Sequence, residues 1–319
     1  MKNRRDFIKA GAVTAVALSV PATAGCITIK KVAPKVPMKP RETGNALVLW
    51  YSQTGYTRRH GRLLAARLET HGYMVTASEI RDFRVRDMER FDLVVIGSPV
   101  FYYDTPDYVK TWIRALPDLK GTPVAAYVTF GGPEGNQDNA ACSILDLLTQ
   151  KNGVPVGSRT FMNMSSFPLA WAGAEVDKKT WKSRHLPDGE TYDRVREYAR
   201  FLTEQLETGN ASEFSKQLTA REMVTWVAPI YWTKKLVHNH SIKEKECINC
   251  GTCVEKCPAD AIDLPDYYVD THACVLCFGC INNCPAGAVY MEYGGDRLVG
   301  YRDFMEKKGL TVTEPEELG

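Results

Sequence analysis

Residues 247–258 read CINCGTCVEKCP, and residues 274–285 read CVLCFGCINNCP. Each cysteine of the first run recurs 27 residues later in the second run, so the stretch is an internal repeat. The repeated cysteines are Cys247, Cys250, Cys253 and Cys257, then Cys274, Cys277, Cys280 and Cys284. Soft thiolates at such short spacings suit iron–sulfur clusters, because three ligands of one turn can reach three irons of the same cubane.

A disulfide framework or a pair of zinc sites could also use cysteines at short spacings. Disulfide scaffolds are small and their cysteines fill most of the chain, whereas these crowd into one part of 319 residues. Zinc binds four thiolates, but zinc modules pair two Cys-x-x-Cys halves and need no third cysteine six residues after the first. The pattern therefore favours clusters, with zinc as the alternative.

The spacing, with a proline after the last cysteine of each run, resembles that of bacterial ferredoxins. The resemblance implies a small α+β domain over residues 241–292 that holds two [4Fe–4S] clusters. In that family the fourth cysteine of each run binds the cluster of the other run. The implied ligands are Cys247, Cys250, Cys253 and Cys284 for cluster I, and Cys274, Cys277, Cys280 and Cys257 for cluster II. His272 is interpreted as a surface histidine rather than a ligand.

Toward the N-terminus, residues 45–209 alternate between short apolar runs and segments of helical spacing. We expect strands at 46–51, 74–80, 91–97, 124–129 and 160–164, and helices ending near 72 and at 106–116, 139–151 and 192–206. Continuous apolar runs are typical of strands that are buried on both faces of a parallel sheet. The alternation predicts a doubly wound α/β domain.

The loop after the first expected strand reads Ser52-Gln53-Thr54-Gly55-Tyr56-Thr57. Its hydroxyl groups, its glycine and the N-terminus of the next helix form a pattern that can bind an anion. The loop resembles the phosphate loop of flavodoxins, which implies FMN. Many flavodoxins have Asn where Tyr56 stands, and Arg58 and Arg59 follow, either to neutralise the phosphate or to face solvent.

Two later loops follow the strands that flank the expected switch point of the sheet, where such folds bind their ligand. They resemble the two loops that flank the flavin ring in flavodoxins, with Phe101 or Tyr102 available to stack on the ring and core packing as the alternative. The residues implied in FMN binding here are Ser98, Pro99, Val100, Phe101 and Tyr102, then Thr129, Phe130, Gly131 and Gly132.

Residues 1–25 resemble a twin-arginine export signal, because Arg4-Arg5 precede an apolar stretch too short to span a bilayer. The signal implies an exported protein, either periplasmic or on the outer face of the cytoplasmic membrane. Either Ala24 ends a plain cleavage site, or Cys26 becomes a lipidated N-terminus, and we favour the lipoprotein. Residues 26–44, rich in proline and lysine, are then expected to form an extended tether.

The remaining segments carry weaker signals. Residues 166–190 are expected to be an insertion near the flavin, and the charged tail 293–319 is expected to be solvated. The connecting segment 210–240 contains an apolar cluster that either packs the two domains together or faces a membrane or quinone; it consists of Met223, Trp226, Val227, Ile230, Tyr231 and Trp232. The net charge of +2 argues against nucleic acid as a partner.

Taken together, the chain resembles flavodoxin–ferredoxin fusion proteins. The resemblance implies an exported electron-transfer protein that relays electrons between FMN and two [4Fe–4S] clusters. The alternative is a flavin-dependent reductase of a small acceptor such as a quinone, and a third hypothesis is a sheet domain without FMN that only docks a partner. A redox partner protein or a membrane electron donor or acceptor is expected, and the sequence does not identify it.

Overall fold

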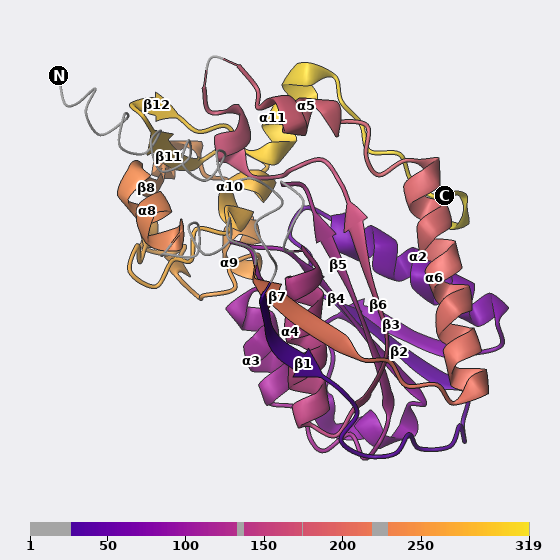
Figure 1. Ribbon diagram of the computed structural model, residues 1–319. Coiled ribbons are helices and arrows are strands. Elements are labelled where there is room, and N and C mark those ends of the chain that lie inside the picture. Colours follow the sequence, from indigo (N-terminus) through magenta and orange to yellow (C-terminus); the bar gives the residue numbers. More distant parts are fainter. Residues whose placement is uncertain (1–26, 133–136, 174, 219–228, 319) are drawn as a thin grey trace.

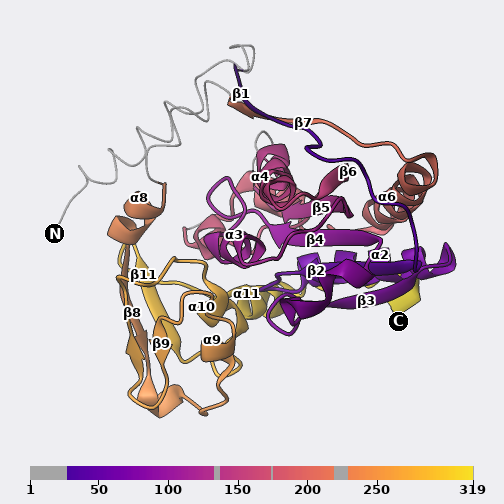
Figure 2. The ribbon, with the colours of Figure 1, turned by 90° about the horizontal axis from the view of Figure 1, so that it is seen from below.

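The computed structural model describes residues 27–132, 137–173, 175–218 and 229–318. The expected signal peptide, Cys26, Met223, Trp226 and Val227 therefore lie outside the described residues. Figures 1 and 2 show an α/β part with a smaller C-terminal part at one end.

A five-stranded parallel sheet forms the centre of the α/β part, in the order β3-β2-β4-β5-β6. Its strands are β2 (Asn45–Trp50), β3 (Met74–Glu79), β4 (Leu93–Pro99), β5 (Pro123–Phe130) and β6 (Val154–Met162). The chain order reverses between β2 and β4, so a ligand is expected at the carboxyl ends of these two strands. Every predicted strand is present, but β6 begins six residues before residue 160.

Helices cover both faces of this sheet (Figure 1). Helices α2 (Tyr56–Thr70) and α6 (Gly189–Thr208) share one apolar core with the sheet, and α3 (Asp107–Arg114) and α4 (Gln137–Gln150) share the other. The strands β2, β4 and β5 are buried almost throughout, which explains their unbroken apolar sequences. The doubly wound architecture predicted from the sequence is confirmed.

Residues 27–44 pack against the α/β part, so the expectation of an extended tether is wrong for them. Strand β1 (Ile27–Val32) pairs antiparallel with β7 (Phe214–Leu218), and Val32 is buried in the core beside α3 and α4. Farther along, the carboxylate of Asp92 accepts backbone N–H bonds from Glu42, Thr43 and Gly44. The sequence did not reveal this, because the partner strand lies more than 180 residues away.

Short antiparallel sheets surround the cysteine repeat in the C-terminal part. Strands β8 (Val237–Ile242), β11 (Val289–Tyr293) and β12 (Asp296–Arg297) form one sheet, and β9 (Ile262–Asp263) pairs with β10 (Tyr268–Val269). Short helices α9 (Thr252–Glu255) and α10 (Gly279–Asn283) contain the third cysteine of each run. Helix α8 (Pro229–Leu236), in the connecting segment, exposes Tyr231 and Trp232.

The tail after residue 293 is docked on the α/β part, which corrects the expectation of a solvated end. Helix α11 (Tyr301–Lys308) packs against Tyr56 and Trp171, with the Trp171 and Phe304 rings stacked at 4.4 Å between centroids. Glu314 also forms an ion pair with Arg59 of α2. In the described part of the chain, no helix is both long and apolar enough to cross a membrane.

Candidate functional site

A cavity of about 490 Å³ opens at the carboxyl ends of the central strands. Thirteen of the fifteen residues predicted to bind FMN line it: Ser52, Gln53, Thr54, Tyr56, Thr57, Pro99, Val100, Phe101, Tyr102, Thr129, Phe130, Gly131 and Gly132. Of the other two, Ser98 is buried and its hydroxyl donates to the carbonyl of Pro99. Gly55 adopts a positive φ of 90° at the start of α2 and allows the turn that directs the loop.

One end of the cavity has the polar groups that a phosphate requires. The hydroxyl of Ser52 is buried without a hydrogen-bond partner, and the hydroxyl of Thr57 lies 2.8 Å from that of Thr129. The first N–H groups of α2 also lie in this loop, where an anion would satisfy them. Arg59 instead pairs with Glu314 and Arg58 is exposed, so neither arginine lines the cavity.

The other end is apolar and tightly shaped. Tyr102 and Tyr103 have positive φ angles of 45° and 72°, which residues with side chains rarely adopt and which often mark ligand-binding loops. A methyl group on Gly131 would lie 2.4 Å from the Cα of Ser165, so only glycine allows the two loops to approach this closely. An apolar slot lined by aromatic side chains and bare backbone fits a flat ring system.

Several lining residues were not predicted individually. The segment after β6 contributes Asn163, whose side-chain oxygen is buried without a partner, and the expected insertion contributes Phe167. Others come from neighbouring loops and from the C-terminal part: Tyr103, Gln137, Met164, Ser165, Ser166, Leu169, Thr233, Leu276, Cys277 and Phe278. The buried polar oxygens of Ser52 and Asn163, together with the apolar slot, fit FMN.

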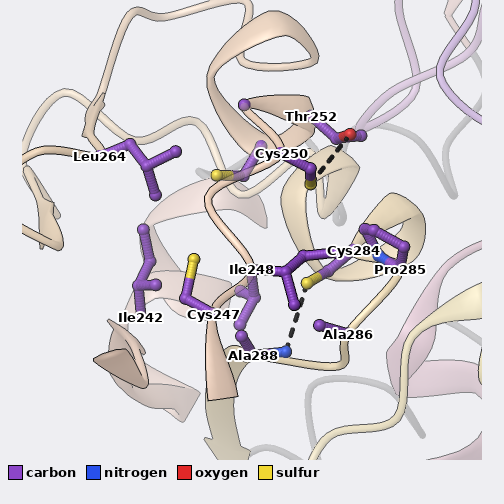
Figure 3. A pocket seen from close by; sticks show the side chains of 13 residues that line it. Ile242, Cys247, Ile248, Cys250, Thr252, Leu264, Cys284, Pro285, Ala286 and Ala288 are labelled. Carbon is purple, nitrogen blue, oxygen red and sulfur yellow. Dashed lines mark hydrogen bonds between the residues drawn. The ribbon is translucent and has the colours of Figure 1, made fainter. Parts of the chain in front are cut away.

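The first cysteine set converges in the C-terminal part (Figure 3). Cys247, Cys250, Cys253 and Cys284 line one small pocket, so the fourth cysteine of the second run joins three from the first. Apolar side chains close the pocket on its inner side, including Ile242, Leu264 and Val289. Four sulfur donors within an apolar wall fit an iron–sulfur cluster.

The second set contains the opposite combination. Cys257 packs against the apolar cluster that contains Cys274 and Cys280, and burial raises the pKa of the Cys274, Cys277 and Cys280 thiols. Backbone N–H groups at equivalent positions of the repeat donate to the sulfurs of both sets. The bonds run from Asn249 to Cys247 and from Leu276 to Cys274 at 3.4 Å, and from Ala261 to Cys257 and from Ala288 to Cys284 at 3.2 Å.

The cavity and the second set share a wall. Cys277 lines the cavity together with its neighbours Leu276 and Phe278. The side chain of Gln53, in the loop after β2, lies against Gly279 of the second run and also donates to the hydroxyl of Tyr51 at 2.9 Å. Across the same junction the hydroxyl of Tyr102 donates to the carbonyl of Leu276 at 2.9 Å.

Two protein families match separate parts of the chain. Residues 47–159 match the model of a flavodoxin domain, and residues 240–263 match that of a 4Fe-4S binding domain. The fold is thus flavodoxin-like, followed by a ferredoxin-like domain. The matches support an electron-transfer role, since a flavodoxin domain implies FMN and a 4Fe-4S binding domain implies a [4Fe–4S] cluster.

Solved structures similar to the chain include flavodoxins. A flavodoxin from the domain Archaea is 14% identical with a TM-score of 0.38, covering 51% of this chain and 99% of its own. Oxidised flavodoxin 2 from Bacillus cereus is 15% identical with a TM-score of 0.39, and the match covers 50% of this chain and 99% of that flavodoxin. Rubredoxin oxygen:oxidoreductase from Desulfovibrio gigas is 16% identical with a TM-score of 0.37, and the match covers 55% of this chain and 38% of that protein. No curated protein matches the chain in sequence.

Proposed function

We propose that this chain is an exported electron-transfer protein that relays electrons between FMN and two [4Fe–4S] clusters. The observation that carries the proposal is that Cys277, from the set assigned to cluster II, lines the cavity assigned to FMN. Electron transfer needs closely placed cofactors, and a shared wall is the arrangement that supplies this. FMN exchanges one or two electrons and a cubane one, so the pair connects one-electron and two-electron partners.

The chain's own residues divide the work of this site. Ser52 and Thr57 would donate hydrogen bonds to the phosphate, and Gly131 would let its loop lie close to the Ser165 loop beside the ring. Phe101 and Tyr102 would exclude water from the ring. Because they hold FMN in place rather than react with it, these side chains have binding and shielding roles.

The first cysteine set would serve as the exit toward a partner. Cys250 is exposed, and the neighbouring Ile248 is 64% exposed, whereas Cys274 and Cys280 of the second set are buried. The order FMN, cluster II, cluster I, partner follows from these exposures. The partner is a redox protein or a membrane electron donor or acceptor.

Anaerobic purification tests the cofactors directly. Flavin release and an iron and sulfide count should give one FMN and eight irons per chain. Reduction of the flavin by light should then reduce the clusters in the same molecule, at a rate independent of protein concentration. A sheet domain without flavin, or zinc in place of iron, would overturn the relay. Rapid steady-state turnover of quinones would instead make the chain a reductase.

Export is proposed from the twin-arginine pattern, and lipid anchoring from Cys26. Replacing both Arg4 and Arg5 with lysine should leave the precursor in the cytoplasm with its cofactors bound, because this pathway exports folded proteins. Fractionation and mass spectrometry of the mature N-terminus test both points. A mature chain that begins after Ala24, with an unmodified Cys26, would exclude the anchor.

A further inference from the structure

The two cysteine sets differ in the side chains that surround them, although their backbone donors are equivalent. His240 and Tyr267 occupy matching positions, seven residues before the first cysteine of each run. His240, on β8, places Nε2 at 3.5 Å from the sulfur of Cys280 and Nδ1 at 3.7 Å from that of Cys274. The hydroxyl of Tyr267 donates instead to the side-chain oxygen of Asn249 at 3.2 Å.

The position of His240 suits a donor rather than an iron ligand. The second set already contains four thiolates, so a histidine ligand is not needed there. The imidazole is largely buried and its edge faces two sulfurs of one set. Since an imidazole has at least one N–H in every protonation state, one of its nitrogens can always donate.

We propose that His240 donates an N–H hydrogen bond to Cys274 or Cys280 of cluster II and thereby raises the reduction potential of that cluster. The inference rests on the proposed function, because it requires a cluster in the second set. A reduced cluster carries one more negative charge than an oxidised one, so a donor to its sulfur stabilises the reduced form more. Tyr267 gives cluster I no equivalent bond.

This bond matters most at cluster II because its surroundings are the more buried. Burial opposes the extra negative charge of reduction, and a buried cluster beside FMN would otherwise be the harder of the two to reduce. A histidine donor offsets part of that cost. It therefore keeps the cluster next to the flavin within the potential range of the relay.

Pulsed EPR on the full-length reduced protein labelled with nitrogen-15 histidine tests the contact without any mutation. A histidine nitrogen should couple to one of the two cluster signals, and the coupling should disappear in His240→Gln. EPR-monitored titration should show cluster II at a more negative potential in His240→Phe. In His240→Gln, whose amide can still donate, the potential should lie between those of wild type and His240→Phe. Cluster I should be unchanged in both.

His238→Phe is the matched control, because His238 lies on the same strand with an exposed side chain. It should leave both potentials and the coupling as in wild type. Two intact clusters without any histidine coupling, or equal potentials in wild type and His240→Phe, would overturn the inference. Absence of iron from the wild-type protein would overturn the proposed function instead. If His240→Phe fails to assemble cluster II, the inference is still tested by the histidine coupling in the wild-type protein and by the potential of cluster II in His240→Gln.

Discussion

At the scale of single residues, His60 shows how burial decides a side chain's chemistry. It lies on α2 next to the loop from Ser52 to Thr57, fully buried, with its ring 5.0 Å from that of Phe161. Nδ1 is 2.8 Å from the carbonyl of Tyr56, while Nε2 has no partner. Burial lowers the pKa of His60 to about 4, so the folded protein holds this ring neutral.

The first prediction concerns the pH dependence of stability. The unfolded chain binds a proton at His60 below its ordinary pKa of 6.5, whereas the folded chain does so only near 4. The contribution of His60 to the free energy of unfolding is therefore complete above pH 6.5 and falls as the pH decreases toward 4. Between pH 6.5 and about pH 5 the loss is about 2 kcal/mol.

Anaerobic urea denaturation at these two pH values measures this loss. His60→Phe should reduce the wild-type difference by the part assigned to His60, because the phenyl ring has no titrating group. His185→Gln, at a histidine whose side chain is 61% exposed, should keep the wild-type difference. Equal pH dependence in His60→Phe and wild type would contradict the assignment.

At the scale of elements, the sequence predicted the strand–loop–helix units well and their long-range partners poorly. The loop from Ser52 to Thr57 was legible because a buried strand, a hydroxyl-rich turn and a helix follow one another directly. The pairing of β1 with β7 could not be predicted from the sequence, since neither polar strand has a regular apolar pattern that marks a buried face. The same holds for α11, whose few buried residues find their partners in the segment near Trp171.

The second prediction concerns the loop after β5, where two adjacent glycines differ. A methyl group on Gly131 would collide with the backbone of Ser165, whereas one on Gly132 would meet nothing within 4 Å. Overpacking of this kind costs about 1–3 kcal/mol, so Gly131→Ala should weaken FMN binding by about tenfold or more. Gly189→Ala is the control, because Gly189 does not line the cavity and an added methyl group there meets nothing within 4 Å; this variant should bind FMN like wild type in fluorescence titrations of the flavin-free protein. If Gly131→Ala and the control variant bind FMN equally well, the close approach of Gly131 to Ser165 does not shape the FMN site.

The third prediction concerns the crossed ligation of the repeat. Cys284 lines the pocket of Cys247 and Cys250, and Cys257 packs against the apolar cluster that contains Cys274. Cys257→Ala should therefore damage cluster II and spare the cluster of its own run, and Cys284→Ala should do the reverse. EPR of the two variants, with each cluster identified by its own potential, decides the matter. Loss of cluster I in Cys257→Ala, with cluster II intact, would contradict the two-fold arrangement.

At the scale of the whole molecule, the cavity is built by both parts of the chain. The flavodoxin-like part supplies the loops that a sequence pattern can identify. Leu276, Cys277 and Phe278 supply a wall that no pattern indicates, since it depends on how the two parts dock. The Phe278 ring packs edge-on against Phe167 of the insertion at 5.2 Å, and Asn282 donates to the carbonyl of Ser166 at 2.9 Å. The second cysteine set and the cavity are therefore joined by direct packing contacts.

The fourth prediction follows from these contacts. Removing a ligand of cluster II with Cys280→Ala should loosen the wall at Cys277, because the bonds from the second set to its cluster hold this loop in shape. FMN should then bind several-fold more weakly. Removing a ligand of cluster I with Cys250→Ala should leave FMN affinity unchanged, because Cys250 is exposed and does not line the cavity. Iron counts verify that each variant loses one cluster, and flavin dissociation constants from fluorescence then measure the coupling. If both variants weaken FMN binding equally, the shared wall is not what connects the two sites, and general destabilisation accounts for the loss.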